Sequence, residues 1–426
     1  MIDIRLIRKN RALVEAKLRT KDPSIDLSAL VAMDEALREK ISALEQLKAE
    51  RNSLSKNIGE LKHQGKDSSE PMVRVGSLGA AIAHLDSEVA AMEAQLHQQL
   101  ACLPNLPMDD IKVADAPSEN LLLKSVGDKP HFAFPFKNHL ELNEQLHLFD
   151  FKRAAKLSGA GWPAYRGFGA RLEWALINYM LAIQIKNGFE QWIPPLLVRK
   201  EVVYGSGQLP KFEHQQFQLC DDDYHLYLIP TAEVPLNGLH MDEILDAELL
   251  PLKYTAYTPC FRREAGAAGS QERGLIRTHQ FNKVEMFAFT LPEQSEELFD
   301  VMVASAEEVL QGLELHYRNM LLVTGDMSFG SARTVDIEVW LPGQGRYYEV
   351  SSISNCTDYQ ARRSNIRFRK KGEKPEFVHT LNGSGLATSR LMVALLENNQ
   401  CEDGSVTVPK VLRPFLGGIE KLTPGL

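Results

Sequence analysis

Two long runs of apolar residues at helical spacing occupy the first quarter of the chain. The first run covers residues 30–61, and the second covers residues 75–96 in steps that alternate between three and four. Such steps are typical of a coiled-coil seam. A polar stretch at residues 63–69 separates the runs, so the pattern predicts two helices paired as an antiparallel hairpin. Each helix would extend roughly 45–55 Å, and we expect this arm to project into solvent.

The rest of the chain mixes strand-like and helix-like patterns. Prolines at 104 and 107 end the second long helix, which predicts an arm domain at 1–108 and a body at 109–426. In the body we expect helices at residues 171–187, 296–315 and 386–397, and strands at residues 189–198, 254–261, 282–290, 335–340 and 346–352. A strand followed by a turn is expected around 377–385. Pro194 and Pro195 would place the first strand at an edge or an interface. Hairpins dominate and no regular βαβ series is present, so we predict an α+β body, an antiparallel sheet flanked by helices.

Composition indicates an ordinary soluble protein of two domains, with 426 residues, 44% of them hydrophobic and 24% charged. The net charge of −8 argues against a generally basic nucleic-acid binder, so any RNA contact must come from a local patch. Such a patch lies toward the expected tip of the arm, in Lys48, Arg51, Lys56, Lys62, Lys66 and Arg74. A basic tip suits a phosphate backbone, whereas the simpler explanation of a coiled coil is oligomerisation.

Other classes of protein are disfavoured by what the sequence lacks. The first residues are charged too early for a signal peptide, and no apolar run is long enough to span a bilayer, so we expect no membrane association. The five cysteines are scattered and never spaced as CxxC, which indicates a reducing cytoplasm and no structural zinc site. No GxxxxGK[ST] or usable GxGxxG motif is present, which argues against P-loop and Rossmann nucleotide sites.

A dense group of charged residues lies between the strands expected at 254–261 and 282–290. Arg262 and Glu264 are two residues apart, so on a strand they would face the same side. The Arg262 guanidinium could clamp a phosphate, and the Glu264 carboxylate could accept from the exocyclic amine of a base. For this pair alone, a plain salt bridge across the hairpin is about as good an explanation.

Two further clusters carry candidate chemistry. Glu349 and the hydroxyl of Ser352 suit Mg²⁺, which prefers few protein oxygens together with phosphate and water, although an exposed strand end is the simpler explanation. The small residues at 380–389 would let a backbone approach a ligand closely, with Arg390 about one turn into the next helix. Turns of this composition are common, so the second signal is weak by itself.

The triplet Thr231, Ala232 and Glu233 lies between apolar flanks. A buried acid requires a cationic partner, and a substrate ammonium would serve. The alternative is a core glutamate paired with one of the many arginines.

Together these clusters resemble the class II aminoacyl-tRNA synthetases. The hairpin around Arg262 is similar to motif 2 of that class, the segment ending in Arg390 to motif 3, and the helix and strand through Pro194 and Pro195 to motif 1, the dimer-forming element. Longer strings resemble the bacterial seryl-tRNA synthetase family: GQLPKF, TAE, FRREAGAAG, HQFNKVEMF, EVSSISNCTDYQARRSNIRFR and TLNGSGLA. The N-terminal hairpin is similar to that family's tRNA-binding arm, so the resemblance runs from the first residues to about residue 420.

The resemblance implies roles for matching residues. The expected serine contacts are Thr231, Ala232, Glu233, Glu285, Asn382 and Ser384. The expected ATP contacts are Arg262, Arg263, Glu264, Thr278, Phe281, Glu349, Val350, Ser351, Ser352 and Arg390, with Mg²⁺ held by Glu349 and Ser352. Arg262 would hold the α-phosphate, Glu264 would read the adenine amino group, and Phe281 and Arg390 would sandwich the ring. Catalysis would be positioning and charge stabilisation by Arg262 and Arg390.

The implied reaction activates L-serine with ATP to seryl-adenylate and transfers serine to the 3′ end of tRNA(Ser), and of tRNA(Sec) where that is present. The family also implies a cytoplasmic homodimer. Departures from its usual strings are small: Ser206, Arg263, Gln271, Glu272 and Ser389. None removes a group that the chemistry requires, and those at 271–272 leave the loop's contacts to the tRNA acceptor end open.

Two rival interpretations are weaker. A ligase that loads an amino acid onto a carrier protein would lack the long arm. A non-enzymatic scaffold that dimerises through the coiled coil would have lost the charged clusters, yet Arg262, Glu264, Glu285, Glu349 and Arg390 are all present.

Overall fold

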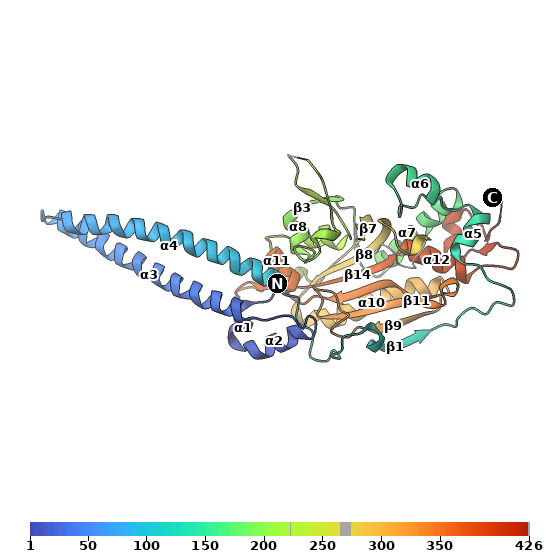
Figure 1. The fold of residues 1–426 in the computed structure, drawn as a ribbon, viewed down its shortest axis with the longest axis horizontal. Helices are drawn as coiled ribbons and strands as arrows, with labels where there is room; N and C mark the ends of the chain where they lie inside the picture. The colour runs from blue at the N-terminus through green and yellow to red at the C-terminus, as the bar shows by residue number, and fades with distance from the viewer. Residues whose placement is uncertain (222, 265–273, 425–426) are drawn as a thin grey trace. The chain divides into compact units, whose positions relative to one another are not determined.

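The computed structural model describes residues 1–221, 223–264 and 274–424. They form two compact units: Ile2–Pro104, and Asn105–Leu426 together with Met1. Each unit is described by itself below (Figure 1). The expected contact between the loop at 265–273 and the tRNA acceptor end lies outside the described residues.

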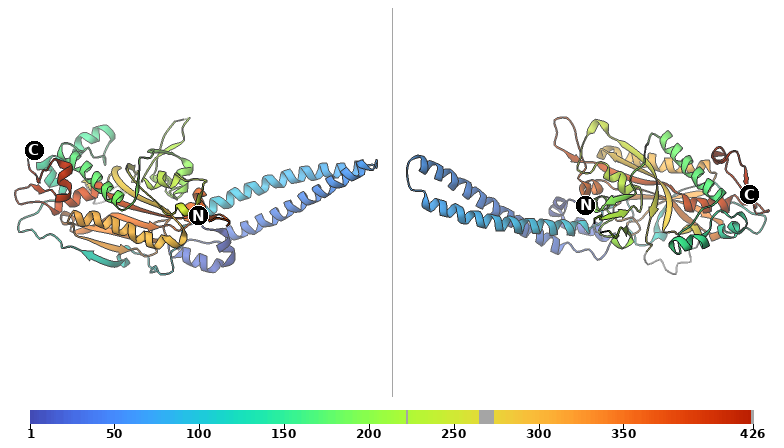
Figure 2. Two further views of the ribbon diagram at one scale, coloured as in Figure 1. Left: turned by 180° about the vertical axis from the view of Figure 1, so that it is seen from behind. Right: turned by 90° about the horizontal axis from the view of Figure 1, so that it is seen from above.

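The first unit is the predicted helical hairpin. Its helices are α1 Ile4–Lys9, α2 Arg11–Arg19, α3 Ser28–His63 and α4 Ser69–Ala101. Helices α3 and α4 pack side by side, as both views of Figure 2 show. The buried seam consists of Leu30, Leu37 and Leu44 from α3 and Leu78, Ile82, Val89 and Leu96 from α4. The apolar spacing therefore predicted this pairing correctly.

The second unit is built on a sheet of eight strands in the order β1-β9-β10-β11-β14-β8-β7-β2. Every neighbouring pair is antiparallel except the edge pair β2–β7. The strands are β1 Leu121–Val126, β2 Glu190–Trp192, β7 Leu252–Phe261, β8 Gln280–Thr290, β9 Tyr317–Leu321, β10 Arg333–Leu341, β11 Arg346–Asn355 and β14 His379–Ala387. This sheet confirms the predicted α+β class.

Helices α7, α10 and α12 cover one face of this sheet. The inward residues Val284, Met286 and Ala288 of β8 share one apolar core with α7, α10 and α12. The helices of this unit are α5 His139–Leu146, α6 Phe151–Ser158, α7 Phe168–Lys186, α8 Lys200–Gly205, α9 Glu233–Gly238, α10 Ser295–Gly312, α11 Tyr359–Ser364 and α12 Thr388–Asn398. The intervening residues of β8 face the other way, because side chains alternate along a strand.

Smaller sheets complete the unit. Their strands are β3 Leu197–Arg199, β4 Phe217–Gln218, β5 Leu226–Leu228, β6 Ile244–Asp246, β12 Arg367–Arg369, β13 Glu376–Phe377, β15 Val406–Thr407 and β16 Lys421–Leu422. Across the described ranges, no helix has the length and apolar character that would let it cross a membrane.

Three predicted elements differ from the structure. The strand expected at 189–198 is two strands in two sheets, β2 and β3, because Pro194 and Pro195 donate no hydrogen bond to a ladder. The expected edge position is correct for β2. The helix expected at 296–315 ends at Gly312, and the one expected from 386 begins at Thr388, since β14 continues through the small residues to Ala387.

Candidate active site

Strand β8 places three functional side chains in a row. Phe281, Lys283 and Glu285 alternate with core-facing residues, so they point to the face of the sheet that α7 does not cover. Phe281 lines a first cavity of about 210 Å³, Glu285 lines a second of about 280 Å³, and Lys283 lines both. The cavities also share Arg262, Glu349 and Ser384, so they adjoin.

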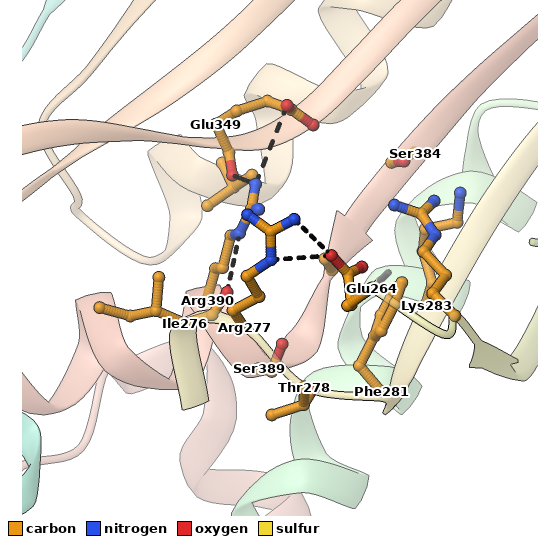
Figure 3. Close-up of a pocket in the computed structure, with 13 residues that line it drawn as sticks. Glu264, Ile276, Arg277, Thr278, Phe281, Lys283, Glu349, Ser384, Ser389 and Arg390 are labelled. Carbon is orange, nitrogen blue, oxygen red and sulfur yellow. Dashed lines mark hydrogen bonds and ion pairs between the residues drawn. The ribbon is translucent and has the colours of Figure 1, made fainter. Parts of the chain in front are cut away.

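The first cavity brings arginines and an aromatic ring together (Figure 3). The Arg390 Nη1 donates to the Glu349 carbonyl oxygen at 2.7 Å and lies 3.8 Å from the Glu349 Oε2. The Arg262 guanidinium lies 5.1 Å from the centre of the Phe281 ring and forms no ion pair with any described residue. Thr278 and Val350 also line this cavity. A flat aromatic face beside unpaired positive charge suits a base attached to phosphates.

The expectation that Arg262 and Glu264 face the same side of a strand is wrong. Strand β7 ends at Phe261, and Glu264 has a φ of 47°, so Arg262 and Glu264 do not share a strand face. The Glu264 carboxylate instead accepts from the Arg277 Nε at 2.7 Å, with the Nη2 at 2.6 Å. Both partners still line the first cavity (Figure 3). Glu264 and Arg277 therefore form a salt bridge across the hairpin, in which Arg262 takes no part, and the expected role of Glu264 toward the base stays a prediction.

The second cavity is rich in carboxylates. Glu285 is 2% exposed, accepts from the Thr231 Oγ1 at 3.2 Å, and forms an ion pair with Lys283. Glu233 accepts from the Gln360 Nε2 at 2.6 Å, rather than from an arginine. Burial, reinforced by the charge of Glu285, raises the pKa of Glu233 to about 7. A ligand ammonium here would favour the charged form of Glu233.

Asn382 and Ser384 of β14 line this second cavity, as the two-residue period predicts. Ala232, by contrast, is fully buried in a separate core cluster with Leu236 and Phe287, and does not line it. Its side chain therefore shapes the wall from behind.

A bulge in β11 aligns the two expected metal ligands. Glu349 and Ser352 are three residues apart, so regular alternation would place them on opposite faces. Opposite β10, however, Ser351 pairs with Ile337 and Glu349 pairs with Glu338, which leaves Val350 as an extra residue. Both Glu349 and Ser352 consequently line the second cavity.

The donor set of this bulge fits Mg²⁺, because one carboxylate and one hydroxyl leave positions for phosphate oxygens and water. Asp336 lies opposite Ser352 in the ladder, and its Oδ1 is buried without a hydrogen-bond partner among the described residues. Burial, and then the charge of Glu349, hold the pKa of Asp336 well above its usual value. Ser351 is turned away: its Oγ donates to the Ser384 carbonyl oxygen.

Some site residues were misplaced or missed by sequence reasoning. Arg263 lines a separate hollow with His214 and Tyr227, away from the side chain of Arg262. Lys283 and Gln360 were not predicted, although both contact predicted carboxylates. The alternation through Phe281, Lys283 and Glu285 could have revealed Lys283, whereas no local signal marks Gln360.

This fold and this site define a class II aminoacyl-tRNA synthetase. The family model described as the tRNA synthetase class II core domain (G, H, P, S and T) matches residues 214–399, which contain β7, β8, β11 and β14. A second model, the seryl-tRNA synthetase N-terminal domain, matches residues 1–107.

The chain belongs to the seryl-tRNA synthetase family of ATP-dependent aminoacyl-tRNA ligases. The serine–tRNA ligase of Chlamydia pneumoniae is 54% identical over 424 residues, which cover 100% of this chain and 99% of that protein. The seryl-tRNA synthetase from Pyrococcus horikoshii complexed with ATP has a TM-score of 0.93 at 38% identity, with both chains covered to 100%. The cytoplasmic serine–tRNA ligase from Naegleria fowleri in complex with AMP has a TM-score of 0.88 at 27% identity, covering 100% of this chain and 99% of that one.

Proposed function

We propose that this chain activates L-serine with ATP and transfers it to tRNA(Ser). The observation that carries the proposal is the pair of adjoining cavities with a common wall at Arg262, Lys283, Glu349 and Ser384. The first suits a nucleotide and the second a small zwitterion with a hydroxyl. Their common wall is where a serine carboxylate would meet the α-phosphate.

The activation step requires no general base, because the serine carboxylate is already ionised when it attacks the α-phosphorus and pyrophosphate leaves. Arg262 would hold the α-phosphate while Phe281 and Arg390 hold the adenine ring from either side. The protein would therefore act by positioning and by stabilising charge on the phosphates. The terminal ribose hydroxyl of the tRNA then attacks the carbonyl of seryl-adenylate.

Serine selection would rest on the second cavity. Glu233 would bind the ammonium with Thr231 beside it, and Glu285 would accept from the serine hydroxyl. Alanine would leave the Glu285 carboxylate without that partner, and sites of this kind discriminate by roughly 10⁴-fold or more. Lys283 would hold the Glu285 side chain in place through their ion pair.

Glu349 and Ser352 would hold Mg²⁺ on the ATP phosphates. When bound, this ion would neutralise phosphate charge. Asp336 lies directly beside Ser352 in the neighbouring strand.

The helical hairpin would bind the tRNA. Lys48 pairs with Asp86 and Arg74 with Glu50, each at 2.8 Å, so these two cations of the basic tip are already partnered. Arg51, Lys56, Lys62 and Lys66 form no ion pair with any other residue of the described ranges, which leaves them available for phosphates. The same role would extend to tRNA(Sec) where that tRNA is present.

The proposal also covers the domain bounds, the cellular location and the oligomeric state of the protein. We assign the arm domain to residues 1–108 and the catalytic domain to 109–426, and place the enzyme in the cytoplasm as a homodimer. Large apolar side chains are exposed on α7 and after β2: Trp174 at 55%, Ile185 at 49% and Ile193 at 88%. Exposed apolar side chains in the motif 1 segment suit a second copy of the chain.

ATP–pyrophosphate exchange with each amino acid in turn tests the proposal. We expect exchange with serine alone, with alanine and threonine as the informative near neighbours. Equal exchange with alanine, or none with serine, would contradict it.

A further inference from the structure

Glu173 is a buried carboxylate that none of these roles uses. It lies on α7, is 4% exposed, and contacts the core side of the sheet, behind the two cavities. Acidic side chains at this depth usually pair with a cation. In the part of the chain that the structure describes, Glu173 has no such partner.

Its two hydrogen bonds join three elements. The Glu173 Oε1 accepts from the Asn282 Nδ2 of β8 at 2.9 Å and from the Thr388 Oγ1 at the start of α12. The Thr388 Oγ1 also lies 3.0 Å from the Asn282 carbonyl oxygen, and the Tyr257 hydroxyl donates to the Asn282 Oδ1 at 3.2 Å. The Asn282 amide and the Thr388 hydroxyl both donate to Glu173, so its Oε1 accepts two hydrogen bonds at once.

The chain neighbours of these donors line the first cavity. Asn282 lies between Phe281 and Lys283, whose side chains point to the opposite face of the sheet. Thr388 is followed by Ser389 and Arg390, which line the same cavity. A displacement of Asn282 or Thr388 would therefore move Phe281 or Arg390, the two groups expected on either face of the adenine.

We propose that Glu173 is a positioning residue for the nucleotide: from behind the sheet it fixes β8 to the start of α12, so that Phe281 and Arg390 keep the spacing that a purine needs. This role rests on the nucleotide site proposed above. Glu173 itself lines neither of the two cavities.

The chemistry of the buried carboxyl supports this role. Burial raises the pKa of Glu173 to about 7, and its Oε2 is buried with no hydrogen-bond partner among the described residues. The Tyr165 hydroxyl is likewise buried and unpartnered, and the charge of Glu173 contributes to raising its pKa. If the Glu173 carboxyl serves only as an acceptor through Oε1, the amide oxygen of a glutamine can take its place. Glu173→Gln, which keeps the acceptor, and Glu173→Ala, which removes it, are therefore a matched pair of variants.

The test compares Glu173→Ala with Glu173→Gln by calorimetric binding of ATP, and by the KM values for ATP and serine in pyrophosphate exchange. Loss of the acceptor in Glu173→Ala should weaken ATP binding about 5- to 10-fold and leave the serine KM within about twofold. Glu173→Gln should bind ATP like the unmodified protein, because its amide oxygen accepts the same two hydrogen bonds. Unchanged ATP binding in a folded Glu173→Ala protein, a Gln variant as impaired as the Ala variant, or an equal loss for both substrates would overturn the proposal.

Thr388→Val and Thr388→Ser provide a second pair if Glu173→Ala does not fold. Valine removes one donor without changing the shape of the side chain and should weaken ATP binding, whereas serine should restore it. Equal ATP affinity of the Val and Ser variants would contradict the proposal. The calorimetric measurement needs no serine activation, so it distinguishes a failure of this role from a failure of the proposed reaction.

Discussion

At the scale of single residues, Glu285 is held from two sides, by the Thr231 hydroxyl and by the ammonium of Lys283. This arrangement fixes one buried carboxylate at the end of the cavity where a serine hydroxyl is expected. Removal of the Glu285 carboxylate should therefore weaken the use of serine selectively and leave the use of ATP nearly unchanged.

Glu285→Ala should raise the KM for serine by about 10- to 100-fold, because a hydrogen bond to a charged group contributes about 1.5–3 kcal/mol. The KM for ATP should change little. Steady-state pyrophosphate exchange measures both, and Glu264→Gln in the first cavity is the matched control with the reverse expectation. Equal losses for serine and ATP in Glu285→Ala would sink the assignment of Glu285 to serine.

The raised pKa of Glu173 predicts that the stability of the folded protein depends on pH. Its pKa is about 7 in the folded chain against 4.5 ordinarily, so the folded state binds more protons between these values. Its contribution to stability is fully present below about pH 4.5 and is lost as pH rises to about 7, at about 1.4 kcal/mol per pH unit. Tyr165 and Tyr257 face it, and burial raises the pKa of both.

Glu173→Gln stays neutral at every pH, so its thermal midpoint should gain on that of the unmodified protein as pH rises from about 5 to about 7. Above about pH 7.5 the difference should be constant. Parallel midpoint curves across this range would show that Glu173 does not titrate there.

At the scale of elements, the basic residues of α3 and α4 fall into two groups, those with an ion-pair partner and those without one among the described residues. Lys56 and Lys62 have no ion-pair partner in the described part of the chain, whereas Lys48 and Arg74 pair with α4 and α3 carboxylates. Since exposed pairs contribute little to stability, neutralising either set should leave the hairpin folded.

Lys56→Gln with Lys62→Gln should weaken tRNA binding more than Lys48→Gln with Arg74→Gln, although both doubles remove two positive charges. The slope of the logarithm of affinity against the logarithm of salt concentration should fall by about one for each phosphate that the protein no longer neutralises. Filter binding of tRNA(Ser) at several salt concentrations measures both effects. An equal weakening in the two doubles would indicate general charge attraction instead of binding at these positions.

Elements with a strong period were predictable from sequence, and local irregularities were not. The alternation of three and four residues gave the α3–α4 hairpin, and alternation in β8 accounts for Phe281 and Glu285 facing the cavities. The bulge at Val350 and the positive φ of Leu386, 103°, are local irregularities that arise when strands pair. The residue pattern of one strand carries no information about its partners, so these irregularities could not be predicted from it. The ion pair between Glu264 and Arg277 likewise forms only when the hairpin closes.

At the scale of the whole molecule, the chain separates into two units whose chemistry differs. In the arm unit, Arg51, Lys56, Lys62 and Lys66 have no ion-pair partner among the described residues, whereas the two cavities are lined by residues of the body alone. Under the proposed function, this separation would let a chain with a net charge of −8 bind tRNA through a local basic patch. It also predicts that the two half-reactions depend on different parts of the chain.

The most direct test of this account replaces residues 30–100 with a short linker and compares two rates in one preparation. Serine-dependent ATP–pyrophosphate exchange should stay within a few fold of that of the full chain, while formation of seryl-tRNA should be abolished. Charging of tRNA at the normal rate by the shortened protein would contradict the account.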